Sequence, residues 1–321
     1  MDIIDGLLSS DEPSVRLRTR LDILGSGPET PELISLREEV RASARVKALL
    51  SQRDAQGRIP GPAYRKWVGT HWVLAALADL GYPPGDEELV PLREQELAWL
   101  LGEKHQKKIR SISGRVRRCA SQEGNALYAL LALGLGDERA DELAWRLCGW
   151  QWPDGGWNCD KRPEASHSSF MESLIPMRAL ILHARMTGST ASRKAADGAA
   201  EIFLKRRLFR RQSDGSIIHP DFVRLHYPCY WHYDILFGLK VLAEGDYLDD
   251  ERCRDALDLL EDKRLADGGF PAERKYYQCG GRARSGQSLV DWGGTSKRRS
   301  NEWVTVHALY VLRVASRLTV D

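Results

Sequence analysis

The stretch QWPDGGWNCDKRPEASHSSFMESL, residues 151–174, combines a glycine turn with the start of an apolar segment. Two tryptophans and a pair of glycines form the turn, and a cysteine, an aspartate, a histidine, serines and a glutamate follow it. Glycine allows backbone conformations that are closed to other residues, so glycine pairs favour tight turns. The stretch therefore predicts a turn leading into a buried helix whose N-terminal end carries many reactive groups.

Similar glycine turns return along the chain. One series has its glycines at positions 57, 155, 215 and 268, and a second series, which closes apolar runs, has them at positions 85, 136, 188 and 245. The two series alternate with a period of roughly 50 residues, which indicates one repeated supersecondary unit. Apolar runs of helical length, such as HWVLAALADL and SLIPMRALILHA, lie between the turns and alternate with amphipathic, charged segments. The unit is therefore predicted to be a helical hairpin with one inner and one outer helix.

The fold class predicted from this repeat is all-α. About six hairpins fit the chain, and they form either an open solenoid or a closed ring. The ring is favoured because one helix of each pair is apolar nearly all round while the other keeps a polar face. Inner helices are expected to start near residues 69, 122, 167, 231 and 301. Residues 1–50 are expected to form a helical lead-in packed on the repeat domain, residues 51–321.

Composition limits the class of protein further. The 321 residues include 47 basic and 45 acidic side chains, so the formal net charge of +2 gives no global attraction to nucleic acid or to a membrane surface. The apolar runs are broken by charges, and the N-terminus lacks a signal-peptide pattern. The six cysteines form no CxxC pair, which is typical of reduced thiols. A soluble cytoplasmic protein without a membrane span is therefore expected.

The opening stretch also resembles a known family. Gln151, Gly156 and Trp157 fit the Gln…Gly-x-Trp turn of squalene and oxidosqualene cyclases, and the DGGW and DGGF turns are similar to those in the β subunits of protein prenyltransferases. As a repeat pattern, the resemblance to the terpenoid cyclase and protein prenyltransferase superfamily covers residues 50–316. It implies an α/α toroid, a ring of hairpins around a central cavity, with functional groups at the N-terminal ends of the inner helices.

Polar and aromatic residues do precede each predicted inner helix. N-capping explains some of them, but it does not explain histidines and tryptophans at the same place in several repeats. If the ring is closed, these ends converge on one pocket that would bind a small apolar or isoprenoid-like ligand. The candidate substrate-binding residues are His71, Trp72, Asn125, Trp231, Tyr233 and Glu302. Burial can tune a carboxyl or imidazole group for proton transfer, and the candidate catalytic residues are Glu123, Asp160, Glu172, His232 and Asp234.

The resemblance lacks two signature motifs. The Asp-x-Asp-Asp motif of class II terpene cyclases is missing, and so is the Asp-x-Cys of the prenyltransferase zinc site. Aligning the GGW turn with that family places His167 near its cysteine ligand and His232 near its histidine ligand. A rearranged zinc site is one interpretation, because these ligand types suit zinc. The other interpretation is that each residue has a separate structural role, as a packed thiol, a turn aspartate and a core histidine. The candidate metal ligands are Cys159, Asp160, His167 and His232.

Two basic segments, residues 104–118 and 205–211, contain clustered lysines and arginines. Such clusters bind phosphate groups, although a basic run is more often a solvated face. Two functions therefore remain open. The first is an enzyme, a cyclase or a prenyltransferase-like transferase, that acts on an apolar substrate in a central cavity. The second is a non-catalytic helical-repeat scaffold that binds nucleic acid or an acidic partner, with nucleic acid the less favoured ligand.

Overall fold

The computed structural model describes residues 2–280 and 285–319, and within them the protein is mostly helical. The one sheet in this part of the chain is a two-stranded antiparallel hairpin of β1 (Arg110–Ile112) and β2 (Arg115–Arg117). The predicted all-α class is therefore confirmed. No helix of the described ranges has both the length and the apolar character needed to span a bilayer.

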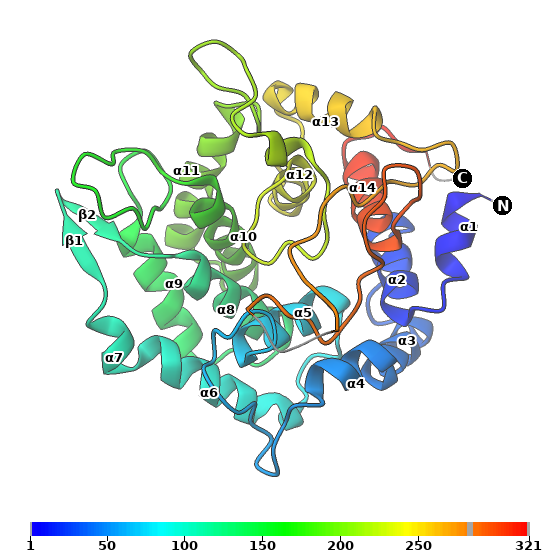
Figure 1. Cartoon of the computed structure of the whole chain (residues 1–321), viewed down its shortest axis with the longest axis horizontal. Coiled ribbons are helices and arrows are strands. Elements are labelled where there is room, and N and C mark those ends of the chain that lie inside the picture. The colour runs from blue at the N-terminus through cyan, green and yellow to red at the C-terminus, as the bar shows by residue number, and fades with distance from the viewer. Residues whose placement is uncertain (1, 281–284, 320–321) are drawn as a thin grey trace.

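Six helical segments lie around the middle of the molecule (Figure 1). They are α2 (Pro13–Arg18), which continues into the π-helical turn η1 (Thr19–Ile23), α5 (Thr70–Leu80), α8 (Ser121–Ala132), α10 (Phe170–Thr187), α12 (Ile235–Glu244) and α14 (Glu302–Val314). From α5 to α14, each of these inner helices packs against the next, and α14 packs against α2 and η1. Arg18 of α2 then donates hydrogen bonds to the carbonyls of Ala78 and Asp79 at the end of α5, at 3.0 and 2.8 Å. The contacts therefore run from α5 through α14 and back to α5.

The remaining helices lie toward the outside in Figure 1. They are α1 (Ile3–Leu8), α3 (Pro31–Ala42), α4 (Ala44–Leu50), α6 (Val90–Leu101), α7 (Glu103–Gln106), α9 (Glu138–Trp150), α11 (Thr190–Leu204) and α13 (Arg254–Glu261), with the 3-10 turns η2 (Glu87–Leu89), η3 (Pro220–Val223) and η4 (Glu251–Cys253). Helices α6, α9, α11 and α13 each pack against the inner helix that precedes them. α12 buries every residue from 235 to 243, whereas α13 buries only Ala256, Leu257 and Leu260. Hydrophobic burial explains why the inner helix of this pair is apolar and the outer one amphipathic.

The glycine turn of the opening stretch, residues 152–157, is called here the Trp157 turn. Gly155 has a φ of +103°, and a Cβ at this position would lie 2.2 Å from the Gly198 carbonyl oxygen, so only glycine fits. The Trp157 side chain is 1% exposed, and its Nε1 donates a 2.9 Å hydrogen bond to the Leu147 carbonyl. The Trp157 N–H donates to the Ser173 hydroxyl on α10 at 3.1 Å. The turn thus joins the end of one hairpin to the inner helix of the next.

The same arrangement recurs at residues 265–270, called here the Phe270 turn. The Phe270 N–H donates to the Thr305 hydroxyl on α14 at 2.9 Å, as Trp157 does to Ser173. Asp267 accepts a 2.9 Å hydrogen bond from the Ser300 hydroxyl, as Asp154 accepts one of 2.6 Å from Ser168. The backbone bond that closes the turn is also shared, at 2.8 Å for Trp152 N to Gly156 O and 2.9 Å for Leu265 N to Gly269 O. At these two turns, the sequence repeat is therefore also a repeat of hydrogen bonds.

Candidate functional site

Two thiols and a carboxylate meet at the N-terminal ends of α8 and α10. Cys119 lies just before α8, Cys159 follows the Trp157 turn, and Glu172 lies in the first turn of α10. Their sulfur atoms and one carboxylate oxygen all lie within 4.8 Å of one another, and Cys159 Sγ is 3.7 Å from Glu172 Oε1. This thiol–carboxylate cluster, Cys119, Cys159 and Glu172, is a group that could hold a metal ion.

Hydrogen bonds orient the cluster. Glu172 Oε2 accepts a 3.0 Å hydrogen bond from the Ser121 N–H at the start of α8, which leaves Oε1 facing the thiol of Cys159. Burial raises the pKa of Glu172, which favours its neutral form. The hydrogen bond between the two thiols raises the pKa of Cys119 and lowers that of Cys159. Cys159 is therefore the thiol that loses its proton more easily.

A buried ion pair lies beside the cluster. Arg118 donates to both carboxylate oxygens of Glu123, with distances from 2.7 to 3.1 Å, and to the Gln122 side chain at 2.8 Å. His105 Nε2 lies 3.4 Å from Glu123 Oε1. Glu123 is fully buried, and Arg118 satisfies both of its carboxylate oxygens. The Arg118 charge also acts on Glu172, where it opposes the effect of burial.

Tyr64 connects this region to a large cleft. Burial raises the pKa of Tyr64 to about 12, and smaller influences on its hydroxyl come from Gln122, Glu172 and Cys119. Tyr64 also lines a cavity of about 770 Å³, a volume typical of ligand pockets. The other residues that line it are Gln52, Arg65, Lys66, Val68, Ser285, Gln287 and Leu289. Tyr64 is therefore shared between the lining of this cleft and the surroundings of the cluster.

Several predicted binding residues meet in an aromatic group between α5 and the segment before α12. The Trp67 ring centroid lies 4.6 Å from that of Trp72 and 5.9 Å from that of His232. Trp231 stacks on His232 at 4.0 Å, and His71 packs edge-on against Trp72 at 4.6 Å. Burial lowers the pKa of His232 to about 3, so this imidazole is neutral near pH 7. The predicted residues His71, Trp72, Trp231 and His232 are thus brought together.

Other predicted residues have local partners. Asp234 caps α12 by accepting from the Phe237 and His226 N–H groups, both at 2.8 Å. The buried Tyr233 donates its hydroxyl hydrogen to the Leu208 carbonyl at 2.7 Å. These hydrogen bonds give both side chains a structural role, Asp234 as a helix cap and Tyr233 as a buried side chain with a satisfied hydroxyl.

Asn125 and Glu302 were predicted to bind substrate as well. Asn125 lines a small cavity of about 20 Å³ beside Trp72, and its Nδ2 is buried with no hydrogen-bond partner among the described residues. The side chain of Glu302, in the first turn of α14, is exposed to solvent. Of these two residues, Asn125 thus lines a cavity and Glu302 points to solvent.

The predicted metal ligands do not come together. Asp160 pairs with Arg162, and the hydrogen bonds from Arg162 lower the pKa of Asp160 to about 2. His167 is exposed, and His232 stacks on Tyr276 at 3.4 Å. Within residues 2–280 and 285–319, Cys159 is the one predicted ligand that belongs to a possible metal group. The additional members are Glu172, which was predicted as a catalytic residue, and Cys119, which was not predicted.

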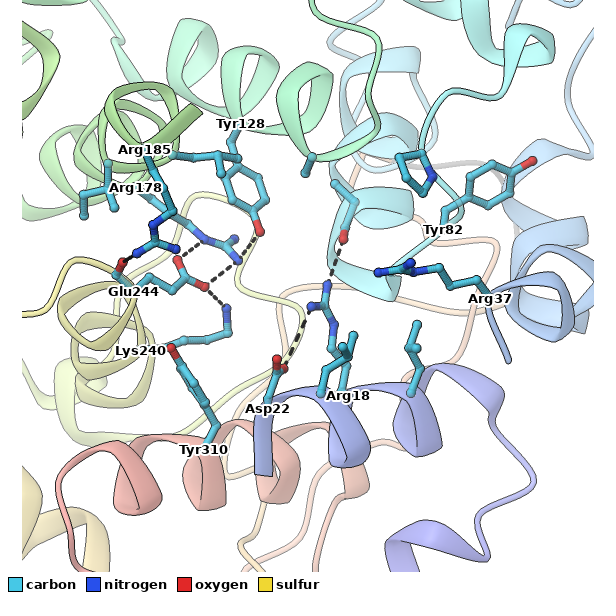
Figure 2. Close-up of a pocket in the computed structure, with 18 residues that line it drawn as sticks. Arg18, Asp22, Arg37, Tyr82, Tyr128, Arg178, Arg185, Lys240, Glu244 and Tyr310 are labelled. Carbon is cyan, nitrogen blue, oxygen red and sulfur yellow. Dashed lines mark hydrogen bonds and ion pairs between the residues drawn. The ribbon is translucent and has the colours of Figure 1, made fainter. Parts of the chain in front are cut away.

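A second pocket of about 320 Å³ lies at the other end of the inner helices (Figure 2). It is lined by the C-terminal halves of all six inner segments, and we call it the charged pocket. Its charged residues are Arg18, Asp22, Arg37, Arg178, Arg185, Lys240 and Glu244. None of the predicted site residues lines it, because all of them were sought at the N-terminal ends.

Comparison with models of known protein families finds no match for this chain. Comparison with curated proteins also finds no match.

Proposed function

We propose that this protein is an α/α-toroid enzyme of the terpenoid cyclase and prenyltransferase type. In this proposal the six inner helices form the wall of the ring, and an apolar, isoprenoid-like substrate enters from the cleft lined by Tyr64. The chemistry takes place at the thiol–carboxylate cluster of Cys119, Cys159 and Glu172. The proposal is supported by the circle of helix contacts and by the repeated glycine turns.

The single observation that carries the proposal is the position of the cluster within the repeat. Cys159 lies two residues after Trp157, and the matching residue after Phe270 is Ala272. Glu172 precedes the turn-binding Ser173, and the matching residue before Thr305 is Val304. The Phe270 turn forms the same hydrogen bonds with an alanine and a valine at these positions. The fold therefore does not require a thiol and a carboxylate at the corresponding positions of the Trp157 turn. Reactive groups that stability does not require are typical of functional sites.

Zinc is the proposed cofactor. Ligand atoms around tetrahedral zinc lie about 3.3–3.8 Å apart, and the 3.7 Å between Cys159 Sγ and Glu172 Oε1 is within this range. The Ser121 N–H would hold the second carboxylate oxygen, as outer partners of metal ligands commonly do. Cys119, Cys159 and Glu172 would supply three ligands and leave a fourth position open, which is typical of catalytic zinc. Bound zinc would act as a Lewis acid and activate a coordinated thiol or water.

The alternative is a non-catalytic scaffold for nucleic acid or an acidic partner. It is favoured by the exposure of Lys104, Lys107, Lys108 and Arg110 in the basic segment 104–118. Arg117 and Arg118 of the same segment point inward instead, toward the Ala165 carbonyl and Glu123. Part of the basic segment therefore belongs to the candidate site rather than to a continuous basic face.

The test measures zinc content and apolar-ligand turnover together. Protein purified without chelator is compared with Cys159→Ser and Glu172→Gln, and Cys279→Ser, an exposed thiol outside the cluster, serves as the matched control. We expect about one zinc per chain in wild type and control, and at least about a tenfold loss of zinc affinity in the two cluster variants. Farnesyl diphosphate and squalene are then supplied, and products are sought by mass spectrometry.

Product formation that disappears in Cys159→Ser and persists in Cys279→Ser would support the enzyme. If neither substrate binds or reacts in the zinc-loaded wild type, while a polyanion such as heparin or RNA binds to the exposed lysines, the scaffold is favoured instead. If the protein contains no zinc but still converts a substrate, zinc is ruled out as the cofactor, and the proposal of an enzyme acting through the thiol–carboxylate cluster stands.

A further inference from the structure

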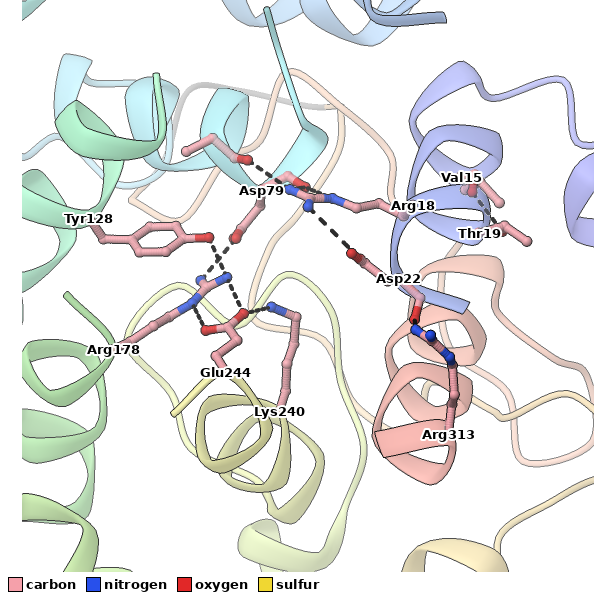
Figure 3. Close-up of polar contacts among 11 residues, drawn as sticks. Val15, Arg18, Thr19, Asp22, Asp79, Tyr128, Arg178, Lys240, Glu244 and Arg313 are labelled. Carbon is pink, nitrogen blue, oxygen red and sulfur yellow. Dashed lines mark hydrogen bonds and ion pairs between the residues drawn. The ribbon is translucent and has the colours of Figure 1, made fainter. Parts of the chain in front are cut away.

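The charged pocket is lined by all six inner segments and is independent of the proposed active site. Its floor is a buried network around Arg178, which donates to Glu244 at 2.7 and 3.0 Å, to Asp79 at 3.0 Å and to the Tyr128 hydroxyl at 2.6 Å (Figure 3). Lys240 donates to the same Glu244 carboxylate. Burial opposes ionisation of Glu244, but Arg178 and Lys240 outweigh it and lower the pKa of Glu244. The floor is therefore an ion network in which the charges are paired.

The rim differs from the floor because its cations, Arg37 and Arg185, have no carboxylate partner at hydrogen-bond distance among the residues that the structure describes. Arg37 donates to the Pro28 carbonyl at 3.0 Å, and Arg185 donates to the Glu244 carbonyl. The nearest carboxylate of Arg185 is Asp246, at 4.0 Å, and the Arg185 side chain is 58% exposed. Figure 2 shows Arg37 and Arg185 reaching the pocket from opposite sides. Two guanidinium groups thus face one cavity from different helices.

The charge balance of the pocket is positive. Five cationic and two anionic side chains line it, a formal excess of three, and the excess is still two when Asp79 behind Arg178 is counted. Of the two lining carboxylates, Asp22 contributes least, because burial raises its pKa despite Arg18 at 3.9 Å. Guanidinium groups in such a cavity bind carboxylate and phosphate oxygens through paired, charge-assisted hydrogen bonds.

Helix dipoles offer a purely structural explanation for some of these cations. The C-terminal end of each inner helix carries a partial negative charge that favours nearby Lys and Arg. Arg18 bonds to terminal carbonyls of α5, and Arg185 bonds to that of α12, which fits this explanation. Arg37 does not fit it, because this residue lies on the outer helix α3 and still lines the pocket.

We infer that the charged pocket binds a small polyanion that carries two or more phosphate or carboxylate groups. One anionic group would lie near Arg37 and Arg18, and another would lie near Arg185 and Lys240 on the opposite side. The volume of about 320 Å³ suits a ligand of this size and excludes a large polymer from the interior. The floor network would fix Lys240 in place before the ligand arrives, which limits the entropy lost on binding.

The inference is tested by thermal unfolding and calorimetry with pyrophosphate, succinate and inorganic phosphate as probes. The variant Arg37→Gln/Arg185→Gln removes both rim cations and leaves the floor intact. The control Lys108→Gln/Arg110→Gln removes the same charge from exposed residues outside the pocket. A probe at ten times its dissociation constant is expected to raise the melting temperature of wild type and control by at least about 2 °C. The rim variant should bind the probe at least about tenfold more weakly.

The three probes distinguish the sources of the anion. Tighter binding of pyrophosphate than of succinate assigns a phosphate ligand, and the reverse order assigns a dicarboxylate; inorganic phosphate, with a single centre, should bind more weakly than the better of the two. An equal rise in all three proteins would overturn the inference, since excluded salts stabilise proteins in general. Unchanged melting of wild type with every probe would overturn it too. If the double variant unfolds without ligand, Arg185→Gln alone is used, because this side chain is mostly exposed.

Discussion

The Trp157 turn and the Phe270 turn have the same backbone but different surroundings. Each closes with a hydrogen bond to a glycine carbonyl, each anchors its aromatic residue to a hydroxyl on the next inner helix, and each has an aspartate that binds a serine. Beyond this framework, the first turn is followed by Cys159 and Glu172, and the second by Ala272 and Val304.

This difference separates what the fold needs from what a function would need. Ala272 and Val304 are buried at 2% and 0% exposure, so the second turn fills these positions with apolar groups. The first turn places two polar, titratable groups there, whose desolvation opposes folding. The comparison predicts that the aromatic and glycine residues matter for stability in both turns, and that Cys159 and Glu172 do not.

The largest effect is expected from removing the aromatic side chains. Trp157→Ala and Phe270→Ala should each lower the free energy of unfolding by about 3–5 kcal/mol, because each ring is buried and a cavity would remain. The Trp157 variant should lose more, since its Nε1 also bonds to the Leu147 carbonyl. Denaturant unfolding of both variants measures this. A loss below about 1 kcal/mol in either would break the claim that both turns hold adjacent hairpins together.

A smaller and unequal effect is expected at the first glycine of each turn. A Cβ at Gly155 would meet the Gly198 carbonyl oxygen at 2.2 Å, whereas one at Gly268 would meet only the Ile3 side chain, at 3.3 Å. Both glycines have positive φ, so strain contributes at both positions. Gly155→Ala should therefore cost about 2–4 kcal/mol and Gly268→Ala about 1–2 kcal/mol. Equal melting temperatures of the two variants would show that the backbone at Gly198 gives way.

The comparison also shows what the sequence could predict. Apolar density and the glycine turns predicted the inner helices from α5 to α14, and α8 begins at Ser121 where a start near 122 was expected. They did not predict α2 as an inner segment, because residues 1–50 were expected to form a lead-in. The α12 start was expected near residue 231 but lies at residue 235. Asp234 forms the N-cap of the helix, and the aromatic residues before it are not helical. Local patterns predict a helix well, but its first residue depends on which side chain caps it.

The candidate site was less predictable because it depends on contacts between repeats. Glu123 and Glu172 were recognisable as carboxylates at helix starts, but which thiol would meet Glu172 depends on how α8 and α10 pack. Cys119, just before α8, was missed for this reason. The charged pocket was missed because cations near helix C-termini have an ordinary explanation, and its residues extend from Leu17 to Tyr310 without a local motif.

The smallest effect on stability is expected from Glu172→Gln, which tests the other half of the comparison. Burial raises the pKa of Glu172 above its ordinary value of 4.5, so the folded protein holds this proton more tightly than the unfolded chain does. The resulting stabilisation is complete below pH 4.5 and is lost as the pH rises through the folded-state pKa. Glutamine stays neutral and can still accept from the Ser121 N–H, so in the presence of chelator the variant should match wild type, or exceed it by up to about 1 kcal/mol, at pH 8.

Adding zinc should reverse this order of stability, because only the wild type would gain the free energy of zinc binding. Unfolding curves at pH 5 and pH 8, with chelator and then with zinc, measure both parts. A loss above about 2 kcal/mol in chelator would mean that the carboxylate belongs to the framework after all, and that the two turns differ in structure as well as in chemistry.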